Sequence, residues 1–237
     1  MKPSVLVTGG ARRIGRRICE TLASSGWNVI VHSRDENDSD AIALADSFSA
    51  ARVWGDLSKS EDVKKLFSLA SNISDNLSAI VNNASLFSVG PITAEDEEKM
   101  YRVNYSTPVL LTQLLFEKLK SSNKSGAVIN LLDTRILSSA FKKTPYSKSK
   151  RELFDFTIQA AKNLSPVLRV NGVAPGPVLV PSAEGLSEKG GKILLSSRPT
   201  PDDVANAVQF LLNAKSVTGQ IIAVDSGQHL ISEEIVR

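Results

Sequence analysis

Short apolar runs alternate with helical patterns along the whole chain, and no other feature of the sequence constrains the fold more strongly. The runs are rich in β-branched residues and are bounded by Gly, Ser, Asn or Pro, which is typical of buried strands. Strands that are apolar on both faces occur in parallel sheets covered by helices, and the crossovers between such strands are right-handed. We therefore predict an α/β fold, a doubly wound sandwich. The predicted strands cover residues 4–7, 27–31, 51–54, 77–83, 126–132, 168–174 and 220–225.

Amphipathic stretches between these runs predict helices that cover the sheet. In the first stretch Ile14, Ile18 and Leu22 recur near one face, and Gly26 follows as a C-terminal cap. No linker, composition shift or internal repeat divides the chain, so we expect a single domain over residues 1–237. The predicted helices cover residues 12–26, 60–72, 146–164 and 201–214.

Residues 175–200 form a loop-like segment that follows the end of a predicted strand. Open parallel sheets bind ligands at this end of their strands, so we predict that the segment is a substrate lid. The alternative is a surface insertion that the fold merely tolerates.

Composition and charge argue against several classes of partner. The net charge of +3 comes without a dense basic stretch, which argues against nucleic acid and an anionic membrane surface. No apolar stretch approaches the roughly 20 residues that span a bilayer, and no secretory signal is visible. The lone cysteine, Cys19, cannot form an internal disulfide, so we expect a reducing, cytoplasmic location. Two distant histidines and one cysteine cannot form a zinc site, so we predict no metal.

The segment "VLVTGGARRIGRR" is predicted to be a strand, a glycine-rich turn and a helix. In that order, main-chain N–H groups and the positive end of the helix can hold a pyrophosphate. Gly9 and Gly10 permit the tight turn, and Gly15 permits close packing of the helix on the sheet. The spacing is not GxGxxG, because Gly9 and Gly15 lie one residue further apart and Arg13 stands between them. The turn alone is therefore weak support for nucleotide binding.

Four arginines occupy the first turns of this helix, where the helix dipole disfavours cations. We expect Arg16 and Arg17 to form a solvated basic face. Arg12 and Arg13 stand at the opening of the helix, where a bound polyanion explains them better.

The end of the second predicted strand indicates which dinucleotide binds. An NAD site usually presents a carboxylate to the ribose 2′-OH here, but His32, Ser33 and Arg34 come first and Asp35 follows them. A 2′-phosphate would suit Arg34 together with Arg12, so we favour NADP(H), while Asp35 leaves NAD open. His32 is interpreted as a hydrogen-bonding scaffold, not as a catalyst.

Tyr146 and Lys150 stand four residues apart at the start of a predicted helix, so their side chains share a face. An ammonium group close to a phenol stabilises the phenolate. We therefore expect Lys150 to lower the pKa of Tyr146 from about 10 toward neutral pH, as an acid catalyst requires. A YxxxK pair is common by chance, but this one follows a candidate cofactor turn and the fifth strand.

Motifs spread over essentially the whole chain resemble the short-chain dehydrogenase/reductase family, and their order and spacing are more specific than any single one. The resemblance implies a Rossmann-like domain with a seven-stranded parallel sheet and helices on both faces, a nicotinamide dinucleotide, and a homo-oligomer, either a tetramer or a dimer. The matching segments are TGGARRIG (8–15), GDLS (55–58), VNNAS (81–85), VNY (103–105), YSKSK (146–150), VNGVAPGPV (170–178) and VTGQIIAVDSGQHL (217–230).

Carried over position by position, the resemblance implies a full set of cofactor contacts. Asp56 and Leu57 would border the adenine, Asn82 to Ala84 the adenosine ribose, and Pro175 with Gly176 the nicotinamide. The cofactor-binding candidates are Gly9, Arg12, Arg13, Ile14, Gly15, His32, Ser33, Arg34, Asp56, Leu57, Asn83, Ala84, Tyr146, Lys150, Pro175 and Gly176.

Two departures from the common family pattern point to one branch of it. Arg13 stands where glycine is usual in the turn, and Asp133 stands thirteen residues before Tyr146, where serine is usual. Both features resemble the pteridine reductases and the bacterial dihydromonapterin reductases, and Phe87 matches an aromatic residue on which those enzymes stack a pterin. The resemblance implies substrate contacts by Arg13, Ser85, Phe87, Asp133 and Tyr146, and a catalytic set of Asp133, Tyr146, Lys150 and Asn104, with Asn104 holding a water in a proton relay.

Asp133 makes ordinary ketone reduction difficult. A serine hydroxyl donates to the carbonyl and steadies the alkoxide, whereas an ionised carboxylate donates nothing and repels it. In reduction of a C=N bond a proton must reach nitrogen, and a carboxylate can relay it or accept from ring N–H groups; Arg13 would offset its charge. We therefore predict an NADPH-dependent reductase of a dihydropterin-like small molecule, held between the nicotinamide and Phe87.

Two alternatives stay open at this point. The first is a carbonyl reductase of the same family, such as a 3-oxoacyl-carrier-protein reductase or a sugar or steroid dehydrogenase. The second is a dinucleotide-binding regulator without turnover. The complete set of Asn104, Tyr146 and Lys150 argues against the regulator, because a pure binder has no need of an activated phenol.

Overall fold

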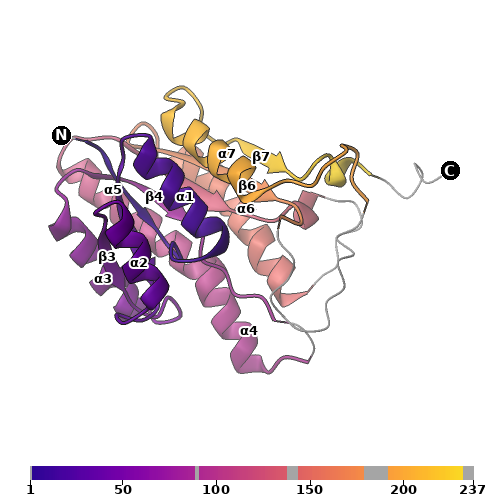
Figure 1. Cartoon of the computed structure of the whole chain (residues 1–237), viewed down its shortest axis with the longest axis horizontal. Coiled ribbons are helices and arrows are strands. Elements are labelled where there is room, and N and C mark those ends of the chain that lie inside the picture. Colours follow the sequence, from indigo (N-terminus) through magenta and orange to yellow (C-terminus); the bar gives the residue numbers. More distant parts are fainter. Residues whose placement is uncertain (1, 89–90, 138–143, 179–191, 232–237) are drawn as a thin grey trace.

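The computed structural model describes residues 2–88, 91–137, 144–178 and 192–231. Within these residues, seven parallel strands form one sheet in the order β3-β2-β1-β4-β5-β6-β7 (Figure 1). The predicted seven-stranded, doubly wound fold is confirmed. The strands are β1 (Ser4–Val7), β2 (Asn28–Ser33), β3 (Ala51–Trp54), β4 (Leu77–Asn82), β5 (Gly126–Leu131), β6 (Leu168–Pro175) and β7 (Ile221–Val224).

Helices connect the strands, and they include the four that the sequence predicts. The three others among the described residues, α2, α4 and α5, are not among the predicted ones. The α-helices are α1 (Arg13–Ser24), α2 (Ser39–Ser47), α3 (Ser60–Ile73), α4 (Ala94–Tyr101), α5 (Thr107–Ser121), α6 (Pro145–Asn163) and α7 (Pro201–Asn213). Three short helical turns, η1 (Arg102–Ser106), η2 (Thr134–Leu137) and η3 (Gln228–Leu230), complete the described elements.

The two faces of the sheet bury separate cores. Along β1, Val5 and Val7 belong to one core and Leu6 to the other, as the alternation of side chains in a strand requires. The first core receives buried residues from α1 and α7, which lie side by side over one face in Figure 1. The second receives them from α3, α5 and α6. No helix in the described part of the chain is long and apolar enough to span a membrane.

The order of the strands places a topological switch point between β1 and β4, because the chain runs outward from β1 in one direction and from β4 in the other. Ligands of open parallel sheets bind outside the carboxyl ends of the strands at such a point. The glycine-rich turn follows β1 there, and Asp133 follows the neighbouring strand β5. The predicted lid falls partly on residues 179–191, which lie outside the described residues, so the lid stays a prediction.

Candidate active site

The turn after β1 is built so that only glycine fits at its tightest points. Gly9 has a φ of 60°, in the left-handed region that favours glycine. A Cβ on Gly15 would lie 2.2 Å from the carbonyl oxygen of Gly9, and one on Gly10 would lie 2.9 Å from the sulfur of Cys19. The N-cap residue of α1, Arg12, makes no side-chain capping bond. The helix thus begins without a capping bond from its N-cap side chain, beside a close-packed turn, an arrangement suited to a phosphate.

Arg13, the first residue of α1, has a φ of 53°. A bulky side chain rarely adopts this region, and holding it there costs about 1 to 3 kcal/mol. Glycine would adopt the same conformation without strain. An arginine at a position suited to glycine therefore indicates that the side chain itself serves a purpose.

Arg12 and Arg34, the two arginines predicted to hold a 2′-phosphate, both pair with carboxylates in this structure. Arg12 bonds to Asp40 and lies 3.1 Å from Oδ1 of Asp38, while Arg34 lies 3.2 Å from Oδ2 of Asp56. Both arginine side chains are more than half exposed, so these pairs are weak enough for a phosphate to compete with them.

Arg16 and Arg17 form the exposed basic face that the sequence predicts, and both pair with Glu20.

His32 bridges the glycine turn and the loop after β3. The N–H of Gly9 donates to Nδ1 of His32 at 3.1 Å, and Nε2 lies 3.1 Å from the carbonyl oxygen of Gly55. These contacts require a neutral ring that carries its proton on Nε2. Burial lowers the pKa of His32 to about 4, which keeps the ring neutral. His32 is thus a hydrogen-bonding scaffold, as the sequence predicts, and it holds the glycine-rich turn through the N–H of Gly9.

The other predicted cofactor residues surround the same edge of the sheet. The side-chain amide of Asn83 donates to the carbonyl oxygens of Thr8 and Gly9, at 2.9 and 3.0 Å, and so holds the turn. Asp56, the partner of Arg34, follows β3 and accepts from the hydroxyl of Ser58 at 2.7 Å, whereas Leu57 is buried. Ser33 is also buried, and Ile14 packs against the core beneath α1. Ala84 packs at the edge of the second core.

Pro175 and Gly176 stand at the end of β6, one strand away from Asp133. The carbonyl oxygen of Pro175 accepts from the hydroxyl of Thr134 at 3.4 Å. The N–H of Gly176 donates to Val224, and a Cβ on Gly176 would lie 2.6 Å from the Cβ of Asp225, so only glycine fits there.

Asp133 and Tyr146, thirteen residues apart in sequence, meet directly. The hydroxyl of Tyr146 donates to Oδ2 of Asp133 at 3.0 Å. Phe87 lies against the same tyrosine, with ring centroids 5.0 Å apart and an interplanar angle of 83°. Phe87 is 52% exposed, which leaves ring surface for a ligand. The structure therefore brings three of the predicted substrate residues together.

Lys150 is buried beneath this group. Its Nζ donates to the carbonyl oxygen of Leu131 at 2.7 Å and lies 5.9 Å from the centre of the Tyr146 ring, so the predicted shared face is confirmed. Burial lowers the pKa of Lys150 to about 8, and the charge of Asp133 opposes that fall.

The predicted lowering of the Tyr146 pKa is wrong in this arrangement. Desolvation first, and the nearby charge of Asp133 second, raise the pKa of Tyr146 well above its usual value. The aspartate that replaces the family's serine brings a negative charge beside the phenol, so forming the phenolate becomes harder. Tyr146 therefore keeps its proton near neutral pH, and in this arrangement it is a weaker acid than a free tyrosine.

Asn104 anchors the loop that carries Phe87. Its Oδ1 accepts from Ser85 at 3.1 Å and from the N–H of Leu86 at 2.8 Å. Its Nδ2 donates to the carbonyl oxygen of Leu86 at 2.9 Å and to the hydroxyl of Ser149 at 3.2 Å. These four bonds use every donor and acceptor position of the amide. The side chain thus positions Ser85 and Phe87, and its predicted role of holding a water stays a prediction.

Arg135 is a site residue that sequence reasoning missed. Its side chain contacts Asp133, and its guanidinium carbon lies 5.4 Å from the ring centre of Phe87 and 5.6 Å from that of Tyr146. The available signal was a cation two residues after Asp133, but spacing along an irregular segment does not say where a long side chain points.

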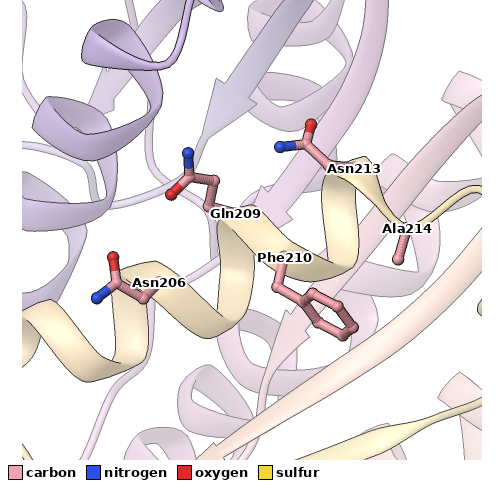
Figure 2. A pocket seen from close by; sticks show the side chains of 5 residues that line it. All are labelled: Asn206, Gln209, Phe210, Asn213 and Ala214. Atoms are coloured by element: carbon pink, nitrogen blue, oxygen red, sulfur yellow. The ribbon is translucent and has the colours of Figure 1, made fainter.

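A hollow also lies on the surface of α7. It is lined by Asn206, Gln209, Phe210, Asn213 and Ala214 (Figure 2). None of these side chains carries a group that could act as an acid, base or nucleophile, so the hollow offers no catalytic chemistry. Within the described residues no group of three or more His, Cys, Asp or Glu side chains could hold a metal ion.

Comparison with known proteins gives consistent results. Residues 3–191 match a family model described as short chain dehydrogenase. The chain is 32% identical to the 3-oxoacyl-[acyl-carrier-protein] reductase FabG of Aquifex aeolicus, over 94% of this chain and 95% of that protein. It is 28% identical to a dihydromonapterin reductase of an Enterobacter species, over 95% and 96%. A crystal structure of FolM alternative dihydrofolate reductase 1 from Brucella canis, complexed with NADP, superposes with a TM-score of 0.86 at 34% identity, over 99% of this chain and 98% of that one.

Proposed function

The chain belongs to the short-chain dehydrogenase family, whose members are oxidoreductases, and from this premise we propose that it is an NADPH-dependent reductase of a dihydropterin-like heterocycle. The residues of the glycine-rich turn and their arginines support the cofactor, and the residues around Asp133 support the substrate.

The cofactor proposal rests on the turn and on its arginines. The close-packed glycines and the uncapped start of α1 suit a pyrophosphate, and Arg12 and Arg34 offer exposed cations near the end of β2. We propose that one set of residues holds the phosphates and the adenosine end of NADPH: Gly9, Arg12, Arg13, Ile14, Gly15 and Arg34. A second set borders the rest of the cofactor: Asn83, Lys150, Pro175 and Gly176. When bound, the nicotinamide would supply the hydride. The bound NADP of the FolM structure supports this choice.

The substrate proposal rests on the hydrogen bond between Tyr146 and Asp133, which is the observation that carries it. The bond shows Asp133 as an acceptor at the point where the family pattern has a hydroxyl donor. A substrate that fits here must present donors to the carboxylate, as the amino and N–H groups of a pterin do. The exposed ring of Phe87 offers such a flat molecule a surface on which to stack. The dihydromonapterin reductase relative agrees with this class of substrate.

The described residues divide the chemistry among them. Tyr146 carries its proton at neutral pH and acts as the proton donor to the substrate nitrogen, although burial and Asp133 raise its pKa and so make it a weaker acid. Lys150 is the buried ammonium close to this phenol, and it stabilises the negative charge that develops on the oxygen during transfer. Asp133 orients the N–H groups of the substrate, and Asn104 holds the loop of Ser85 and Phe87 against the site.

The direct test is turnover. NADPH oxidation is followed with dihydrobiopterin, dihydromonapterin, dihydrofolate and an acetoacetyl thioester, and NADH is the control for cofactor choice. We expect turnover of at least one dihydropterin with NADPH. Brisk reduction of the thioester alone would contradict the substrate proposal.

A carbonyl reductase is the second candidate, and the similarity to FabG over most of both chains favours it. The carboxylate of Asp133 argues against it, because an alkoxide formed beside an ionised acid is destabilised. The same panel of substrates separates the two candidates.

A further inference from the structure

Arg135 lies at the centre of the contacts that define the proposed substrate site. It belongs to η2, the short turn that follows β5 and Asp133. Its main-chain N–H donates to Oδ1 of Asp133 at 2.9 Å, and its Nε lies 3.3 Å from the same oxygen. Oδ1 is thereby taken by Arg135, and Oδ2 is the oxygen that faces Tyr146 at 3.0 Å. The arginine thus fixes the rotation of the carboxylate.

The same guanidinium covers the aromatic pair. It lies within cation–π range of both Phe87 and Tyr146, whose rings are themselves in edge contact. Its side chain is 64% exposed, so it stands on the solvent side of the group while Lys150 lies beneath it. One cation therefore contacts three of the five side chains proposed to meet the substrate, those of Phe87, Asp133 and Tyr146.

The charge of Arg135 also balances that of Asp133. Burial and the carboxylate raise the pKa of Tyr146, and Arg135 is the cation that opposes this rise. Removal of Arg135 would leave the charge of Asp133 beside the phenol without this cation on the solvent side. Lysine would restore a charge at this position, but neither the planar contact with the rings nor the directed Nε–H.

We propose that Arg135 is a positioning residue that holds Asp133 as an acceptor aimed at the substrate, and that it thereby selects flat heterocycles bearing N–H groups over ketones. The inference deepens the proposed function and rests on it for the identity of the substrate. Arg135 acts through Asp133 and Phe87. Asp133 orients the N–H groups of the substrate, and Phe87 orients the plane of its ring.

The test compares R135M and R135K with R151M, a matched control. Arg151 also pairs with a carboxylate, Asp155, and also lies over an aromatic ring, that of Phe154 at 5.2 Å, and its NH1 bonds to η2 through the carbonyl oxygen of Ile136. The R151M variant therefore measures the effect on the fold of losing an exposed arginine near η2 that does not contact the candidate site.

Three quantities are measured for each variant: kcat and KM for a dihydropterin with NADPH, the Kd of biopterin from its fluorescence in the presence of NADP⁺, and the Kd of NADPH. For R135M we expect kcat/KM to fall about five- to thirtyfold, as for the loss of an exposed ion pair together with the cation–π contacts, with a weaker Kd for biopterin and an unchanged Kd for NADPH. R135K should recover part of the loss, and R151M should stay within about twofold of the natural protein.

Activity of R135M equal to that of R151M would overturn the inference, and so would a parallel loss of NADPH binding, which indicates a general structural role. A natural protein that reduces no dihydropterin contradicts the proposed function instead. The acetoacetyl thioester then decides the inference, because R135M should alter its kcat/KM and R151M should not.

Discussion

The hydroxyl of Tyr146 donates a 3.0 Å hydrogen bond to Oδ2 of Asp133, so a proton donor and an acceptor face each other in the candidate site. With serine in place of Asp133, two hydroxyls would face a substrate carbonyl together. With aspartate, the site combines one donor and one acceptor. A ring nitrogen that needs a proton, beside an N–H group that needs an acceptor, matches this combination.

From the left-handed conformation of Arg13 we predict that this residue lowers the stability of the fold and strengthens ligand binding. Both Arg13→Gly and Arg13→Ala remove the arginine side chain. Arg13→Gly also relieves the backbone strain, whereas Arg13→Ala retains that strain. We expect R13G to be more stable than R13A by about 1 kcal/mol in urea unfolding. Both variants should bind NADPH or the dihydropterin more weakly than the natural protein. Full affinity for both ligands in R13G would show that the strained arginine serves no binding purpose.

The ion pair between Arg12 and Asp40 predicts a variant with tighter cofactor binding. Asp40→Asn removes one of the two carboxylates that pair with Arg12 and leaves Asp38, so the Kd for NADPH should fall about two- to fivefold, which corresponds to about 0.5 to 1 kcal/mol. NADH, which lacks the 2′-phosphate, should show no gain. Asp202→Asn is the matched control, because it frees Arg17 on the same helix from a similar exposed pair. An equal gain for NADPH and NADH would argue against contact between Arg12 and the phosphate.

The buried Lys150 predicts a pH-dependent difference in stability. Its pKa in the folded protein is lowered to about 8 by burial, below its ordinary value of 10.5. The stabilising contribution of the neutral amine is therefore complete above pH 10.5 and is lost as the pH falls through about 8. Relative to K150M, the natural protein should lose roughly 3 kcal/mol of unfolding free energy between pH 10.5 and pH 7.5. Parallel curves of urea stability against pH would contradict this.

The buried His32 predicts sensitivity to acid. Burial lowers its pKa from 6.5 to about 4, so its contribution to stability is complete above pH 6.5 and is lost as the pH falls through 4. A proton on Nδ1 would also face the N–H of Gly9, so the cofactor turn should loosen in acid. Relative to H32Q, the natural protein should lose unfolding free energy and NADPH affinity between pH 6.5 and pH 4.5. If H32Q lost unfolding free energy and NADPH affinity over the same pH range as the natural protein, His32 would not be the cause of the acid sensitivity.

The sequence predicts the fold well where local patterns carry it. All seven strands are recognisable because each is a short apolar run, and the sheet buries most of them, whereas β3 and β7 at its two edges are only partly buried. The missed helices lack a clear stripe of apolar residues: α4 buries only Met100, and α5 is apolar on several sides because it packs against both the sheet and its neighbours. Tertiary contacts, not periodicity, stabilise these helices.

The candidate site is only partly predictable for a similar reason. The motif spacing predicts that Asp133, Tyr146 and Lys150 lie together. Asp133 follows the end of β5, and Tyr146 and Lys150 are one turn apart at the start of α6. The direction of the Tyr146 pKa depends on burial and on the distance to the carboxylate, which the sequence does not contain. The place of Arg135 depends in the same way on how η2 folds back over Phe87.

The most direct test of the central claim is the change in substrate preference of Asp133→Ser. The ratio of kcat/KM for a dihydropterin to that for an acetoacetyl thioester is measured with NADPH for the natural protein and for D133S. We predict that the natural protein prefers the dihydropterin and that D133S loses this activity while its thioester reduction rises. A D133S enzyme that retains the dihydropterin activity and gains none with the ketone would contradict the account.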